Sequence, residues 1–170
     1  FDGTGFLSAW TDPNGVSMTF TYSSGRLVKV VDDTGHTLTY NYASSQLSSI
    51  VDEAGVTLVS YRYDASSRLS EVEDRYGHVT KYFYTATGYL ERIVLPTQAG
   101  DPTLREIKFE YALVNWFGAW GSSTPVLTKI TDAMDNVTTF DYAFIVDGKP
   151  DSGVRTTVTD ALGKQTTYEC

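Results

Sequence analysis

Aspartates recur at nearly constant spacing along this 170-residue chain, and carboxylates can bind Ca²⁺ or work in pairs as an acid and a base. Four of them open an Asp-x-x-Gly pattern: Asp12–Gly15, Asp32–Gly35, Asp52–Gly55 and Asp74–Gly77. A calcium loop gathers several oxygen ligands within about a dozen residues, whereas each segment here offers one or two carboxylates. The pattern therefore favours a repeated turn, in which the carboxylate accepts backbone N–H bonds and glycine supplies a positive φ.

Other residues with chemical potential also occupy repeat positions. Asp33-Thr34-Gly35 has the letters of an aspartic-protease signature, but Pro-Asn-Gly, Glu-Ala-Gly and Arg-Tyr-Gly fill the same place in the other turns. His36 and His78 both follow a turn glycine, where Val16 and Val56 stand elsewhere, so a metal site is not predicted. No serine or cysteine is arranged with a histidine as a nucleophile, and no phosphate-binding glycine loop occurs. We predict no catalytic residue, no cofactor and no metal ligand.

Each turn is followed by a short alternating segment that ends in an aromatic-x-Tyr pair. Leu38, Tyr40 and Tyr42, for example, alternate with polar residues, which is the period of a half-buried strand. The aromatic positions are Phe20, Tyr22, Tyr40, Tyr42, Tyr61, Tyr63, Tyr82, Tyr84, Phe109, Tyr111, Phe140, Tyr142 and Tyr168. Aromatics at one place on successive strands form cross-strand ladders worth about 0.2–1 kcal/mol per pair. We favour this structural role over a platform that stacks sugars.

The turn aspartates lie 20, 20 and 22 residues apart, and a period in this range is typical of an array of supersecondary units. Single extra residues between Gly55 and Tyr63, and between Tyr63 and Leu69, are interpreted as β-bulges. We predict an all-β array of antiparallel hairpins that forms a twisted, curved sheet. The regular units cover about residues 6–94.

Later units, over about residues 95–170, carry extra loops but keep the turn at Asp132 and at Asp160–Gly163, with Asp135 in one glycine position. An excursion from Ala112 to Pro125 is the one segment that the repeat does not explain, and it contains Trp116, Phe117 and Trp120. Non-repeat loops can bind partners or cover a sheet edge, and we favour packing. The whole chain is expected to be one domain, residues 1–170, excised from a longer protein.

The bulk composition limits the partners. The net charge is −8 and the thirteen basic residues are scattered singly, which disfavours nucleic acid and anionic membrane surfaces. The lone Cys170 forms no internal disulfide. No signal peptide lies within the sequence, and no apolar run approaches the roughly 18 residues of a membrane span.

The combination of Tyr63-Asp64 with Arg68-Leu69, followed by Asp-x-x-Gly, resembles the RHS/YD-repeat family, and Tyr22 with Arg26-Leu27 is a variant. The resemblance implies a strip of hairpins that spirals into a hollow shell around a C-terminal effector, commonly a toxin. It implies a bacterial protein that is secreted, injected or displayed on the cell surface. The autoproteolysis known in that family is not carried over, because neither Asp-Pro pair of this chain has the required surroundings.

The expected partners are the remainder of the parent protein and its enclosed cargo polypeptide, with self-association possible through open sheet edges. We predict a structural segment without catalytic activity. The main alternative is a surface-displayed binding module that recognises a glycan or a protein receptor through the decorated loops, and a hydrolase that uses a carboxylate pair is the least favoured alternative.

Overall fold

The computed structural model describes residues 1–97, 103–115, 123–144 and 153–169. These residues form fourteen β-strands and no helix, so the predicted all-β fold is confirmed. Two units, Phe1–Thr80 and Lys81–Cys170, are distinguished by their internal contacts and are described separately. None of the described segments is a helix long and apolar enough to cross a membrane. The expectation of one continuous domain stays a prediction.

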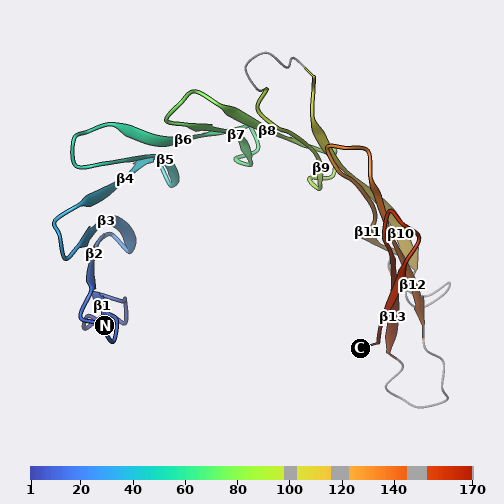
Figure 1. Cartoon of the computed structure of the whole chain (residues 1–170), viewed down its shortest axis with the longest axis horizontal. Helices are drawn as coiled ribbons and strands as arrows, with labels where there is room; N and C mark the ends of the chain where they lie inside the picture. Colours follow the sequence, from blue (N-terminus) through green and yellow to red (C-terminus); the bar gives the residue numbers. More distant parts are fainter. Residues whose placement is uncertain (98–102, 116–122, 145–152, 170) are drawn as a thin grey trace. The chain divides into compact units, whose positions relative to one another are not determined.

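In the first unit the strands are β1 (Ala9–Thr11), β2 (Ser17–Ser23), β3 (Arg26–Asp32), β4 (Thr37–Ala43), β5 (Gln46–Val51), β6 (Thr57–Tyr63) and β7 (Leu69–Asp74). The others are β8 (Val79–Tyr84), β9 (Leu90–Val94), β10 (Glu106–Asn115), β11 (Ser123–Thr131), β12 (Val137–Phe144), β13 (Val154–Thr159) and β14 (Gln165–Glu169). Within each unit, every strand pairs antiparallel with the next one along the chain. Figure 1 shows both units as ribbons one strand thick.

The alternation of residues gives each sheet two different faces but no enclosed core. In β4, Tyr40 and Tyr42 are half-buried while Asn41 between them is exposed. Among the residues whose exposure is described, none is buried, whether apolar or polar. Most domains bury one face of a sheet against a second layer. The described residues contribute no second layer to either unit, because the strands of each unit pair edge to edge.

A β-bulge lies directly before the second tyrosine of five hairpins, at Tyr22, Tyr42, Tyr63, Tyr84 and Tyr111. In the β4–β5 hairpin, Asn41 pairs with Ser49 and Tyr42 pairs with Leu47, so Ser48 is the additional residue. Side chains alternate on either side of a strand. The bulge therefore allows Leu47 and Ile50, three residues apart, to lie on the same face.

The two single insertions seen in the sequence have different structural outcomes. The one between Gly55 and Tyr63 is absorbed by a register shift at Ile50/Val51, as predicted. The one between Tyr63 and Leu69 was interpreted as a bulge, and this interpretation is wrong. The extra residue lengthens the connection between β6 and β7 into a loop closed by hydrogen bonds between Asp64 and Arg68.

The segment that the repeat pattern did not explain is partly regular. β10 continues to Asn115, and β11 already begins at Ser123, with ladder pairs from Ala112↔Val126 to Asn115↔Ser123. The described parts of the Ala112–Pro125 excursion therefore extend the β10–β11 hairpin beyond the length of the other hairpins. Trp116, Phe117 and Trp120 lie outside the described residues.

Candidate functional site

The Asp-x-x-Gly turns share one hydrogen-bonded loop, which we call the Asp loop. At Asp52, the Oδ1 atom accepts the N–H groups of Ala54 at 3.0 Å and Val56 at 2.8 Å. The Asp52 N–H donates to the Val56 carbonyl at 3.0 Å, and the Gly55 N–H donates to the Asp52 carbonyl at 3.1 Å. A single carboxylate thus accepts hydrogen bonds from two backbone N–H groups of the turn, which lie outside the ladder between the two strands.

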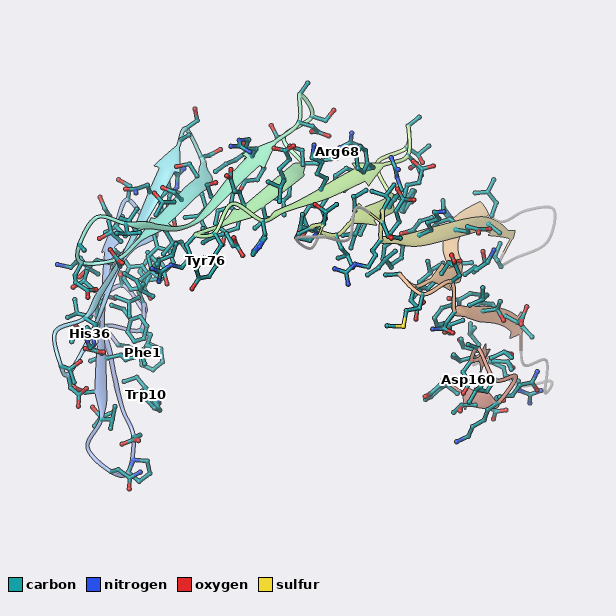
Figure 2. All side chains as sticks on the ribbon, turned by 45° about the horizontal axis from the view of Figure 1, so that its top comes forward. Phe1, Trp10, His36, Arg68, Tyr76 and Asp160 are labelled. Carbon is teal, nitrogen blue, oxygen red and sulfur yellow. The ribbon has the colours of Figure 1, made fainter. Side chains whose placement is uncertain are left out.

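Asp loops with this bonding start at Asp2, Asp12, Asp32, Asp52, Asp64, Asp74, Asp132 and Asp160, the last of which is labelled in Figure 2. Two of these were not among the predicted turns. Asp2-Gly-Thr-Gly5 has the literal pattern and was overlooked at the chain start, whereas Asp64 has Ser67 in the glycine position. At Thr85 the hydroxyl replaces the carboxylate and accepts the Tyr89 N–H at 3.1 Å.

The fourth residue of every Asp loop adopts a positive φ, and this explains why glycine usually occupies that position. Gly55 has φ = 79°, and no other atom lies within 4 Å of the place where its Cβ would stand. Asp135 and Ser67 adopt φ = 62° and 63° in the same position. Backbone conformation, rather than lack of space, therefore limits the residue type at Gly55.

The second-column tyrosines connect successive hairpins, through a contact that we call the tyrosine latch. In four of them the hydroxyl donates to the carbonyl of a leucine in the preceding hairpin, each time at 2.9 Å: Tyr42 to Leu27, Tyr63 to Leu47, Tyr111 to Leu90 and Tyr142 to Leu127. Burial raises the pKa of Tyr111 and of Tyr142, which keeps these hydroxyls protonated as donors.

The hairpin geometry explains why the leucine carbonyl is available. In β4–β5, Ala43↔Gln46 flanks a two-residue loop, so this pair exchanges both of its hydrogen bonds. The adjacent pair, Tyr42↔Leu47, is then of the non-hydrogen-bonded type. Its backbone groups point away from each other, and the Leu47 carbonyl faces β6, where Tyr63 donates to it.

The first-column aromatics lack this role. Within the described part of the chain, the hydroxyls of Tyr40 and Tyr61 make no hydrogen bond. Phenylalanine fills the equivalent places at Phe20, Phe109 and Phe140. The sequence prediction gave both columns the same structural role, whereas in the structure hydroxyl hydrogen bonds to leucine carbonyls are made from the second column.

In several units the residue before the leucine also contacts the next hairpin. Phe6 stacks on Tyr22 with ring centroids 4.8 Å apart, and the Arg26 guanidinium lies 5.5 Å from the centroid of the Tyr42 ring. Arg26 also donates to the Ser44 carbonyl at 2.7 Å. Gln46 donates from Nε2 to the Ser67 carbonyl at 2.8 Å. An aromatic, an arginine or a glutamine in this position can therefore each contact the next hairpin.

His36 and His78 each contact the aspartate of their own loop, and His36 is labelled in Figure 2. The Nδ1 atom of His36 lies 3.1 Å from Asp32 Oδ2, and that of His78 lies 2.8 Å from Asp74 Oδ2. The loops are separated along the chain by β4 to β7, and both imidazoles are exposed. No group of three or more histidine, cysteine or acidic residues that could hold a metal ion occurs within the described ranges.

Replacing Asp32 with Asn is expected to lower the pKa of His36 toward its ordinary value of 6.5. The hydrogen bond to Asp32 and its charge raise the pKa of His36, and the charge of Glu53 adds to this. The pKa of Asp32 is lowered to about 2, mainly by the hydrogen bond from the Thr34 hydroxyl and to a smaller extent by the hydrogen bonds to His36. Titration of the His36 Hε1 resonance by NMR measures the change. Glu53→Gln is the milder comparison, and an unchanged pKa in Asp32→Asn would contradict the assignment.

The sign of this coupling sets its pH range. The raised pKa of His36 contributes stability that is complete below 6.5 and is lost as the pH rises through the folded-state pKa. The lowered pKa of Asp32 contributes stability that is present above 3.8 and is lost as the pH falls toward about 2. The pair therefore contributes most between these limits.

The geometry defines a class of protein: a single-layer array of antiparallel hairpins, closed by Asp loops and joined by tyrosine latches. Residues 1–37 match the family model described as RHS Repeat. This match and the fold confirm the resemblance to the RHS/YD-repeat family that the sequence pattern indicated.

Two solved structures have a similar fold. The crystal structure of TcdB2-TccC3-Cdc42 is 16% identical with a TM-score of 0.50, over 91% of this chain and 9% of that chain. The crystal structure of TcdB2-TccC3-TEV is 14% identical with a TM-score of 0.54, over 93% of this chain and 9% of that chain. The present chain therefore spans a small part of each of these proteins. Comparison with curated proteins finds no match.

Proposed function

We propose that this chain is a non-catalytic structural segment of an RHS/YD-repeat shell that encloses a C-terminal effector polypeptide. The observation that supports this most strongly is that none of the residues whose exposure is described is buried, although successive hairpins are joined by specific hydrogen bonds. A sheet with this construction resembles a wall more than a domain with its own core. Its partners are then the rest of the parent protein and the cargo.

A wall of this kind acts by excluding other molecules. The Asp loops close the turns, and the tyrosine latches join neighbouring hairpins, so the wall is held together by its own hydrogen bonds. Many toxins must be kept from the cell that makes them, and enclosure achieves this without an inhibitor. We propose a bacterial protein that is secreted, injected or displayed at the cell surface, in keeping with the family resemblance.

The proposal is tested by proteolysis of the full-length protein. One variant carries a protease recognition sequence in its C-terminal effector segment, and a matched control carries the same sequence in the exposed Asp12–Val16 loop. We expect the loop site to be cut at least about 100-fold faster than the effector site while the native shell is intact. Disruption of the shell with a denaturant should bring the two rates together.

Equal cleavage rates at both sites in the native protein would contradict enclosure. In that case the alternative of a surface-displayed binding module becomes the better explanation. A glycan array with the full-length protein would then show a specific signal that depends on the decorated loops.

A further inference from the structure

Strand β10 extends past the strand on one of its two sides. Its ladder with β11 runs to Asn115↔Ser123, whereas its ladder with β9 runs only from Glu106↔Val94 to Lys108↔Arg92. β9 begins at Leu90, directly after the Thr85–Tyr89 loop. Among the described residues, no strand pairs with β10 from Tyr111 onward on the side that faces the β8–β9 hairpin, so this side is an open sheet edge.

Pro125 determines which backbone groups point to this edge. It lies opposite Leu113, and it has no N–H to donate. The pair therefore cannot exchange two hydrogen bonds, and the N–H and C=O of Leu113 point away from β11. Tyr111 has the same orientation because it lies two residues earlier on the same strand. The open edge thus presents two sets of donors and acceptors.

The same place contains a cleft of about 530 Å³, formed by the end of the β8–β9 hairpin and the extension of β10. Its apolar wall includes Tyr89, Tyr111, Leu113 and Pro125. The rings of Tyr89 and Tyr111 lie 5.2 Å apart, and Leu113 is 70% exposed. An open backbone edge and an apolar cleft are the two requirements for binding an extended peptide: the edge supplies affinity and the cleft supplies specificity.

The charges at the cleft favour a basic peptide. Glu91 and Glu110 both line it, and Lys129 pairs with Glu110 at 2.8 Å from the far side of β10. Glu91 is exposed, and no ion pair to it is found among the described residues. The chain as a whole carries a net charge of −8. A Lys or Arg on the peptide would therefore be attracted to the rim of the cleft.

We propose that the open edge of β10 binds an extended, basic polypeptide segment by strand addition, with one apolar side chain of that segment in the cleft. The peptide pairs with the outward backbone groups of Tyr111 and Leu113. Its apolar residue packs against Tyr89 and Leu113, and a basic residue lies near Glu91. This inference concerns a binding surface and does not depend on the enclosure of an effector.

The test is fluorescence anisotropy with the full chain and a labelled peptide, acetyl-Lys-Thr-Val-Thr-Val-Lys-amide. Leu113→Pro removes the outward N–H but no hydrogen bond to β11, so we expect the affinity to fall at least about tenfold. Leu113→Ala keeps that N–H and should cost a smaller, several-fold loss. Val114→Ala, on the opposite face of β10, is the control and should bind like the unmodified chain.

A second arm does not depend on the folding of any variant. The same peptide with its four central backbone nitrogens methylated keeps its side chains and charges but cannot pair along an edge. We expect it to bind at least about tenfold more weakly. Equal binding of the methylated peptide would overturn strand addition. Full displacement of the parent peptide by a neutral oligosaccharide, or loss of peptide binding whenever the chain self-associates at higher concentration, would overturn the proposed occupant.

Discussion

Replacing Tyr42 and Tyr63 together with Phe is expected to lower the free energy of unfolding by about 2 kcal/mol, about 1 kcal/mol for each lost hydrogen bond. Each hydroxyl donates to a leucine carbonyl at 2.9 Å, and each leucine carbonyl faces the next hairpin rather than its own partner strand. Phe keeps the ring but leaves the carbonyl without its donor. Urea unfolding followed by far-UV circular dichroism measures the change.

The matched control is the double replacement of Tyr40 and Tyr61 with Phe. These residues lie on the same strands and the same face, but their hydroxyls make no hydrogen bond within the described residues. The change in stability should remain within about 0.5 kcal/mol, as for most substitutions that remove no specific contact. If both double variants lost the same stability, the latch would have no special role and the two columns would be equivalent.

Replacing Gly55 with Val is expected to cost about 1–3 kcal/mol, because a β-branched residue is strained at a φ of 79°. Space is not the limit, since a Cβ on Gly55 would have no other atom within 4 Å. The strain therefore acts on the loop between β5 and β6 and on the register of β6. Thermal unfolding of the variant measures the cost.

Gly3→Val provides the comparison. Gly3 also has open space for a side chain, but its φ lies outside the left-handed region. This variant should unfold like the parent chain. An equal loss in both variants would show that bulk, rather than backbone conformation, decides which residue is accepted. In the reverse direction, Asp135→Gly should be neutral or stabilising, because Asp135 already adopts φ = 62°.

The hairpin array could be predicted from sequence because its signals are local. An aspartate and a glycine three residues apart determine a turn through bonds that stay within five residues, and alternation determines which residues share a face. Asp132 shows how robust this is, since Asp135 replaces the glycine without changing the hydrogen bonds. Asp2 obeyed the same rule and could have been found by it.

The junctions could not be predicted in the same way. Tyr63 and Leu47 are 16 residues apart, and nothing in either segment alone shows that a hydroxyl meets a carbonyl. The bulge at Ser48 interrupts the period of two. Leu47 and Ile50 are three residues apart, so alternation alone would place them on opposite faces, although they share one. One signal was present: tyrosine fills the second column without exception from Tyr22 to Tyr142, while phenylalanine enters the first.

The latches also determine how the chain responds to damage and how it forms. Each one joins a hairpin only to the hairpin before it, at sequence separations of 15 to 21 residues. Stability in such an arrangement is a sum of unit and nearest-neighbour terms. A broken junction should therefore fray locally and leave distant hairpins intact. In every latch the tyrosine donates to a leucine that lies earlier in the sequence. Each hairpin can therefore dock on the preceding one as soon as it leaves the ribosome, without waiting for residues still to be synthesised.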